Sequence, residues 1–114
     1  MNSSSPESVI CRYSVKPGRD REMERLLAKH WPALNAEGLV TDEPSLVYRS
    51  RPKTDGGAAA SSGTVYVEIF TWKSAEAPEA AHQLPGVMAV WEPMGAICDT
   101  MEFPHFERIT PAKS

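Results

Sequence analysis

The sequence predicts an α+β domain of the ferredoxin-like class, with the element order β-α-β-β-α-β and an antiparallel four-stranded sheet. Three observations lead to this class. Several segments alternate apolar and polar residues, two segments repeat apolar residues at helical spacing, and their order is that of the split βαβ unit. The length of 114 residues suits one core. We expect a single domain over 8–109, between a disordered N-terminal tail (1–7) and a C-terminal tail (110–114).

The first strand and the first helix are predicted in the first third of the chain. Residues 8–15 carry an apolar side chain at every second position, which is typical of a strand. Residues 16–38 place apolar side chains on one helix face, and Gly38 stands where a left-handed C-terminal cap belongs. Pro32 has no N–H for the carbonyl four residues earlier, so we expect it to kink or open the last turns. The helix face comprises Met23, Leu26, Leu27, His30 and Leu34.

The second and third strands are predicted on either side of a long loop. Residues 45–51 read as a strand, and residues 52–63 are rich in Gly, Ser and Ala, as in a mobile hairpin loop. In residues 64–72, the side chains at odd and at even positions point to opposite faces of the sheet, and both groups are mostly apolar. Whichever group faces the helices, the other leaves an apolar surface on the opposite face. We therefore expect a homodimer joined through its sheets. The two phases are Val65, Val67 and Ile69, and Tyr66, Phe70 and Trp72.

The second helix and the last strand are both interrupted by proline. Residues 73–99 have helical periodicity, with Ser74 as the expected N-cap and with Pro85 and Gly86 ending a first piece. Residues 100–109 alternate as a strand until a proline, which favours an edge strand or a bulge. The apolar stripe of the second helical piece comprises Val87, Val90, Trp91, Met94, Ile97 and Cys98, and we expect Trp91 and Met94 to be buried.

The composition is that of an ordinary globular protein and excludes several classes of partner. The chain is 41% hydrophobic and 24% charged, with a net charge of -3, so it has no basic surface for nucleic acid or an anionic membrane. No apolar run is long enough for a membrane span, and the start lacks the features of a signal peptide, so we expect a cytoplasmic protein. Cys11 and Cys98 read as small buried thiols, and the three histidines are too scattered to predict a metal site.

Three segments together resemble the antibiotic biosynthesis monooxygenase-like family of dimeric α+β barrels. They are "KPGRDREMERLL", "VYVEIFTWKSAEAPEAAH" and "MEFPHFERI", and the resemblance spans residues 8–109 apart from the 52–63 loop. It implies the ferredoxin-like fold and a sheet-to-sheet dimer. The superfamily includes cofactor-independent oxygenases of aromatic polyketides, haem-degrading enzymes and small proteins without an established activity.

The resemblance also bears on cofactors. The haem-degrading branch relies on an asparagine, a tryptophan and a histidine, and the corresponding positions here hold Cys11, His82 and Glu92. We therefore expect no haem, and no other cofactor.

Cofactor-free oxygenation requires a base, a group that stabilises an anion and a dry aromatic pocket. His82 is the candidate catalytic base, because an imidazole accepts a proton near neutral pH. The alternative is a histidine that only caps the end of a helix or lies half exposed. His30, on the apolar stripe of the first helix, is expected to be a hydrogen-bonded core or interface histidine, with a position in the same cavity as the alternative. His105 is expected to have a structural or interfacial role.

The candidate substrate-binding residues are Arg12, Trp72, Trp91 and Met94. The two tryptophans and Met94 would line a pocket for a flat ring, or they are simply core. Arg12 would hold a phenolate within a charged layer that includes Glu68 and Arg49, or these charges form an ion-pair network at the dimer interface.

The leading hypothesis is a dimeric, cofactor-independent monooxygenase that acts on a small aromatic or quinol-like molecule in a hydrophobic pocket. The alternative is a non-enzymatic dimeric module, for binding a small molecule or for a stress response, that uses the same pocket to hold a hydrophobic metabolite.

Overall fold

The computed structural model describes residues 6–51, 63–106 and 109. The order of elements is the predicted one, except that the second helix and the last strand are each divided in two. The elements are β1 (Glu7–Val15), α1 (Asp20–Ala36), β2 (Leu46–Arg49), β3 (Val65–Trp72), α2 (Ala77–Ala81), α3 (Pro85–Ile97), β4 (Cys98–Glu102) and β5 (His105–Phe106).

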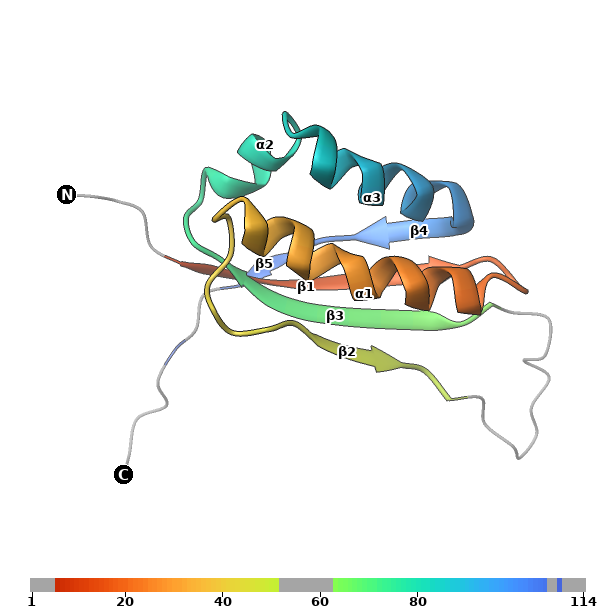
Figure 1. The fold of residues 1–114 in the computed structure, drawn as a ribbon. Helices are drawn as coiled ribbons and strands as arrows, with labels where there is room; N and C mark the ends of the chain where they lie inside the picture. The colour runs from red at the N-terminus through yellow and green to blue at the C-terminus, as the bar shows by residue number, and fades with distance from the viewer. Residues whose placement is uncertain (1–5, 52–62, 107–108, 110–114) are drawn as a thin grey trace, which may run out of the picture.

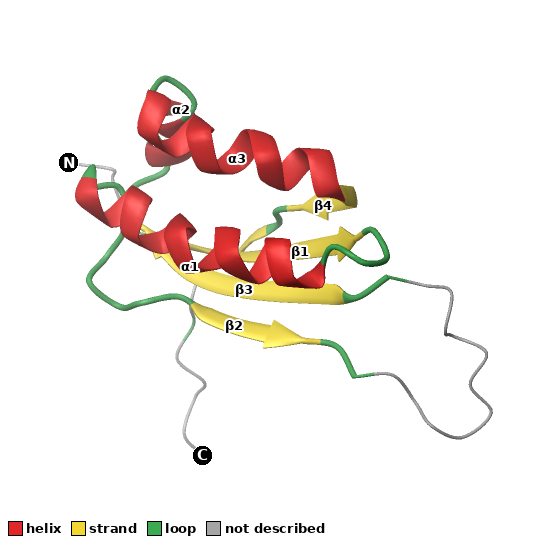
Figure 2. Ribbon diagram, turned by 45° about the vertical axis from the view of Figure 1, so that its right-hand side comes forward, coloured by secondary structure: helices red, strands yellow, loops and turns green. Residues whose placement is uncertain are grey.

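The sheet is antiparallel, and all of the helices lie on one of its faces (Figure 1). Its order is β2-β3-β1-β4, with β5 paired to β1 beyond the end of β4. Figure 2 shows α1 and α3 lying next to each other above the sheet, with β2 at one edge. The ferredoxin-like α+β class is confirmed, and β1, the first strand in the chain, lies at the centre.

Strict alternation of burial fixes which face of β3 meets the helices. Tyr66, Phe70 and Trp72 are buried beneath the helices together with Glu68, whereas the residues between them are only half-buried. The residues of β3 that face away from the helices are therefore those of the alternating set that contains Val67. On β1 the inward residues are likewise buried, so the core lies between the inner face of the sheet and the helices. The inward residues of β1 are Val9, Cys11, Tyr13 and Val15.

Helix α1 ends as the sequence predicts. Gly38 has a φ of +73°, and the N–H groups of Gly38 and Leu39 bond back to the carbonyls of Asn35 and Leu34 at 3.0 and 3.1 Å. This is the Schellman arrangement, in which a left-handed residue after the helix satisfies its last carbonyls. Pro32 lies inside α1 and does not end it.

The predicted second helix is two helices, and three details of the prediction were wrong. Pro85 is the first residue of α3, a position where the missing N–H costs nothing, so it starts the second piece. The N-cap of α2 is Glu76 and not Ser74, whose carbonyl instead accepts the N–H of Ala77 at 3.2 Å. Met94 is fully buried as expected, but Trp91 is only partly buried.

The last strand is broken at Pro104, as the proline signal indicated. β4 and β5 pair only with β1, so they form an edge of the sheet. Between them the carbonyl of Pro104 accepts the N–H of Ile10 at 3.1 Å, which keeps the two pieces against the same strand.

Other predictions fall partly outside the described residues. The antiparallel pairing of β2 with β3 confirms the hairpin, but its loop, apart from Gly63, lies outside them, as do most of the predicted tails. Within the described residues, no helix has the length and apolar character needed to cross a membrane.

The cap at Gly38 gives a stability prediction. Gly38→Ala should lower the free energy of unfolding by about 1 kcal/mol, because L-residues are disfavoured at a φ of +73° although no atom lies within 4 Å of the new Cβ. The control is Gly95→Ala inside α3, where the space is also open and alanine should stabilise the helix by roughly 0.5–1 kcal/mol. Urea unfolding measures the free energy of unfolding of both variants. A change of the same sign in both variants would contradict this prediction.

Candidate functional site

A cavity of about 240 Å³ lies between the helices and the inner face of the sheet, near β5. Its wall is aromatic and sulfur-containing, and it includes all three histidines of the chain. The lining residues are Cys11, His30, Phe70, Trp72, Pro78, His82, Trp91, Met101, Phe103 and His105. Ligand sites typically combine such an apolar wall with a few polar groups.

His30 is the most connected polar side chain of the cavity. Its Nε2 accepts a hydrogen bond from Trp91 Nε1 at 2.7 Å, and its Nδ1 lies 2.8 Å from Glu68 Oε1. The ring is only 2% exposed and packs edge-on against Phe70, with the ring centroids 5.6 Å apart. The prediction of a hydrogen-bonded core histidine is confirmed, and the same ring also faces the cavity.

Glu68 is the buried partner that connects this histidine to the sheet. It is 0% exposed, and its Oε1 also accepts a hydrogen bond from Tyr13 Oη at 2.8 Å. Burial, followed by the neighbouring carboxylate of Glu68, raises the pKa of Tyr13, which therefore remains a donor. Among the described residues, Glu68 Oε2 is buried without a partner.

His82 lies at the cavity wall in a different setting. It is the C-cap residue of α2 and is exposed, so the geometry fits both the capping and the cavity predictions made for it. Its ring meets the Trp91 ring in a T-shaped contact with the centroids 4.9 Å apart. In the part of the chain that the structure describes, its ring nitrogens make no hydrogen bond, which leaves one of them free to accept a proton.

The structure brings together some of the predicted binding residues and separates others. Trp72 and Trp91 line the cavity. Trp72 is 4% exposed, and its Nε1 has no partner among the described residues. Met94 is buried in the core and is not part of the cavity wall.

Arg12 lies on the other face of the sheet from the cavity. It alternates with the buried residues of β1 and pairs with Glu102 at 3.8 Å, with both side chains more than half exposed. The predicted layer of Arg12, Glu68 and Arg49 was therefore wrong. Glu68 belongs to the inward phase of β3, opposite Cys11, and Arg49 pairs with Glu24.

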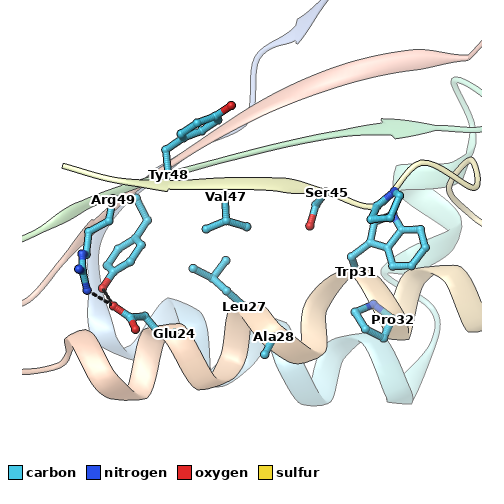
Figure 3. A pocket seen from close by; sticks show the side chains of 11 residues that line it. Glu24, Leu27, Ala28, Trp31, Pro32, Ser45, Val47, Tyr48 and Arg49 are labelled. Atoms are coloured by element: carbon cyan, nitrogen blue, oxygen red, sulfur yellow. Dashed lines mark hydrogen bonds and ion pairs between the residues drawn. The ribbon is translucent and has the colours of Figure 1, made fainter.

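A second hollow of about 600 Å³ lies between α1 and the edge strand β2 (Figure 3). At one end Glu24 Oε2 accepts hydrogen bonds from Arg49 Nη1 and Tyr66 Oη, both at 2.7 Å, and these two donors lower the pKa of Glu24. Figure 3 places Trp31 at the other end and shows Tyr48 pointing away from the helix. This groove is larger but open, and its charged groups already satisfy one another. The smaller cavity is the better candidate site.

Sequence reasoning named Glu68 only in a charged layer with Arg12 and missed its contact with His30. The available signal was a lone carboxylate between Tyr66 and Phe70, in the phase of β3 that faces the helices. A charge at such a position needs a partner, but the partners come from α1 and β1, which the sequence alone does not place opposite it. No group of three or more His, Cys, Asp or Glu suited to a metal occurs in the described ranges.

Comparisons with known proteins bear on the fold. No protein-family model matches the sequence, and no curated protein is significantly similar to it. SnoaB, a cofactor-independent oxygenase from Streptomyces nogalater, superposes with a TM-score of 0.68 at 17% identity, over 97% of this chain and 100% of that one. PA3566 from Pseudomonas aeruginosa gives 0.69 at 17% identity, over 96% and 100%.

A proposed antibiotic biosynthesis monooxygenase from Chloroflexus aurantiacus gives a TM-score of 0.64 at 14% identity, over 96% of this chain and 98% of that one. At these identities the likeness concerns the fold. The chain therefore has the fold of antibiotic biosynthesis monooxygenase-like proteins, as the sequence resemblance implied.

The thiol in the cavity wall gives a prediction on pH. Burial raises the pKa of Cys11 from 9.0 to about 12, so between these values the unfolded chain loses a proton that the folded chain keeps. Stability should fall as pH rises through this range, by about 1.4 kcal/mol per pH unit from this group. Urea unfolding at several pH values measures how the free energy of unfolding falls with pH. This fall should be smaller for Cys11→Ala than for the unmodified protein, and an equal fall in both would exclude the effect.

Proposed function

We propose that the protein is a cofactor-independent monooxygenase of a small aromatic or quinol-like compound that binds in the 240 Å³ cavity. The observation that carries the proposal is the wall of this cavity, which combines the aromatic rings of Phe70, Trp72 and Trp91 with histidine side chains. Aromatic rings favour a flat ligand, and a few polar groups in such a wall fix the ligand's orientation. The likeness in fold to a cofactor-independent oxygenase supports the same reaction class.

The reaction begins with the removal of a proton. A phenol, enol or activated methylene becomes electron-rich enough to pass one electron to dioxygen only after it has lost a proton. His82 is the proposed base, since it lines the cavity and its ring nitrogens have no partner within the described residues. Its contact with Trp91 holds the imidazole beside the aromatic wall, where a flat substrate would stack.

The second candidate function is a non-enzymatic module that holds a hydrophobic compound. The observation that favours it is the exposure of His82, because a base in contact with water gains less from the protein environment than a buried one. The same cavity would then bind the ligand without transforming it.

Oxygen consumption separates the two functions. With anthrone and a two-ring quinol as substrates, the protein should consume oxygen faster than heat-inactivated protein. His82→Ala should lower kcat/KM about 100-fold or more, the usual contribution of a general base. Gln83→Ala, at the exposed neighbouring position, is the control and should keep full activity. Quenching of tryptophan fluorescence by these compounds without any oxygen consumption would instead support the binding module.

The outer face of the sheet supports a proposed homodimer. Val65, Val67 and Ile69 are half-buried there, and β2 adds Leu46 and Tyr48, which are 55% and 56% exposed. The pairing of Leu46 with Ile69 and of Tyr48 with Val67 makes these side chains one continuous apolar surface. A second copy of the chain is the proposed partner, since the patch matches itself about a two-fold axis.

Light scattering tests the dimer. The unmodified protein at micromolar concentration should show twice the 12.5 kDa mass of one chain. Val67→Glu places a charge at the centre of the outer face and should give the mass of a monomer. Ala89→Glu, on the exposed side of α3, should leave the dimer intact. A single-chain mass for the unmodified protein would rule out the proposal.

A further inference from the structure

A chain of hydrogen bonds leads from the cavity wall into the core. Trp91 Nε1 donates to His30 Nε2 at 2.7 Å, and His30 Nδ1 lies 2.8 Å from Glu68 Oε1. Because an indole N–H only donates, Nε2 is the acceptor and the neutral ring carries its proton on Nδ1. This proton is donated to the carboxylate. A carboxylate in this position fixes the tautomer and the orientation of an imidazole and stabilises its protonated form.

The burial of this pair is difficult to explain by stability alone. His30 is 2% exposed and Glu68 is 0% exposed, and Glu68 Oε2 has no partner in the described ranges. Apolar residues of similar volume often give a core equal or greater stability than a buried ionisable pair. The ring of His30 also lines the cavity, so a ligand bound there would lie beside this ring.

We infer that His30 is a second proton acceptor of the cavity and that Glu68 is its positioning residue. The inference rests on the proposed monooxygenase function, and it assigns to His30 the proton that leaves after oxygen has been added. Trp91 is the link between the two histidines, since it contacts the ring of His82 and donates to His30. A ligand that takes this indole N–H frees Nε2 to act as a base.

The chemistry needs two proton removals from the substrate. After the first, which His82 performs, the anion passes one electron to dioxygen and the two radicals join through a new carbon–oxygen bond. The protonated His82 then returns its proton to the terminal peroxide oxygen. The reacting carbon now carries one hydrogen and one hydroperoxide group.

His30 completes the oxidation. Its Nε2 takes the remaining hydrogen of that carbon as a proton, and the C–H electron pair becomes the second bond of a carbonyl. The O–O bond breaks, and the leaving hydroxide takes the proton from the imidazolium to form water. One dioxygen thus yields one carbonyl and one water. A buried base suits this step because exclusion of water prevents side reactions of the hydroperoxide.

The test is a comparison of two variants with a matched control. Glutamine in His30→Gln can still accept from Trp91 and donate to Glu68, but it does not exchange a proton. Glu68→Gln removes the charge that supports the imidazolium. The control Tyr66→Phe deletes a phenol on the same strand as Glu68 that donates instead to Glu24, outside the cavity wall. With anthrone as substrate, oxygen consumed, ketone formed and organic peroxide are measured together, and urea unfolding reports the stability of each variant.

In the unmodified protein, ketone formed should equal oxygen consumed. In His30→Gln and Glu68→Gln, kcat for ketone formation should fall about 100-fold with little change in KM, while peroxide accumulates. Tyr66→Phe should lose stability but keep the ratio of ketone to oxygen. An unchanged ratio in both glutamine variants would overturn this inference and leave the proposed function intact. If the unmodified protein consumes no oxygen, both this inference and the proposed monooxygenase function are wrong.

Discussion

The carboxylate of Glu68 is the constraint around which the rest of the molecule is arranged. It lies in the phase of β3 that faces the helices, where it is fully enclosed. An unpaired charge in such a place costs several kcal/mol, so the surrounding elements must bring donors to it. Tyr13 comes from the neighbouring strand β1 and His30 from the helix above, and His30 is in turn bonded to Trp91 of α3. One side chain thus fixes the positions of the central strand and both long helices.

The different character of the two faces of the sheet follows from the alternation of inward and outward residues along β3. Because the inner phase of β3 carries this polar cluster and the aromatic wall, the outer phase is left with aliphatic residues that none of the described helices covers. Each face therefore has a different requirement. The proposed aromatic ligand would occupy the cavity on the inner face, and the proposed second copy of the chain would cover the apolar outer face.

Much of the fold was predictable because it depends on local patterns. Strand alternation, helix periodicity and the glycine cap at residue 38 are all set by a few neighbouring residues. The site was predictable only in part. His82 and Trp72 were recognised by residue type, and both line the cavity. Arg12 was placed there as well, although its alternation with buried Cys11 assigns it to the opposite face. The link between Glu68 and His30 joins residues 38 positions apart, and no local pattern encodes such a contact.

The central position of β1 has a consequence for the folding of the chain. Glu7–Val15 is synthesised before its partners β3 and β4, which end at Trp72 and Glu102, so both of its edges stay unpaired until those strands have been made. Non-local strand pairing is slow, and an unpaired strand that carries apolar side chains is prone to associate with other chains. The nascent protein therefore passes through a period in which its innermost strand is its most vulnerable segment.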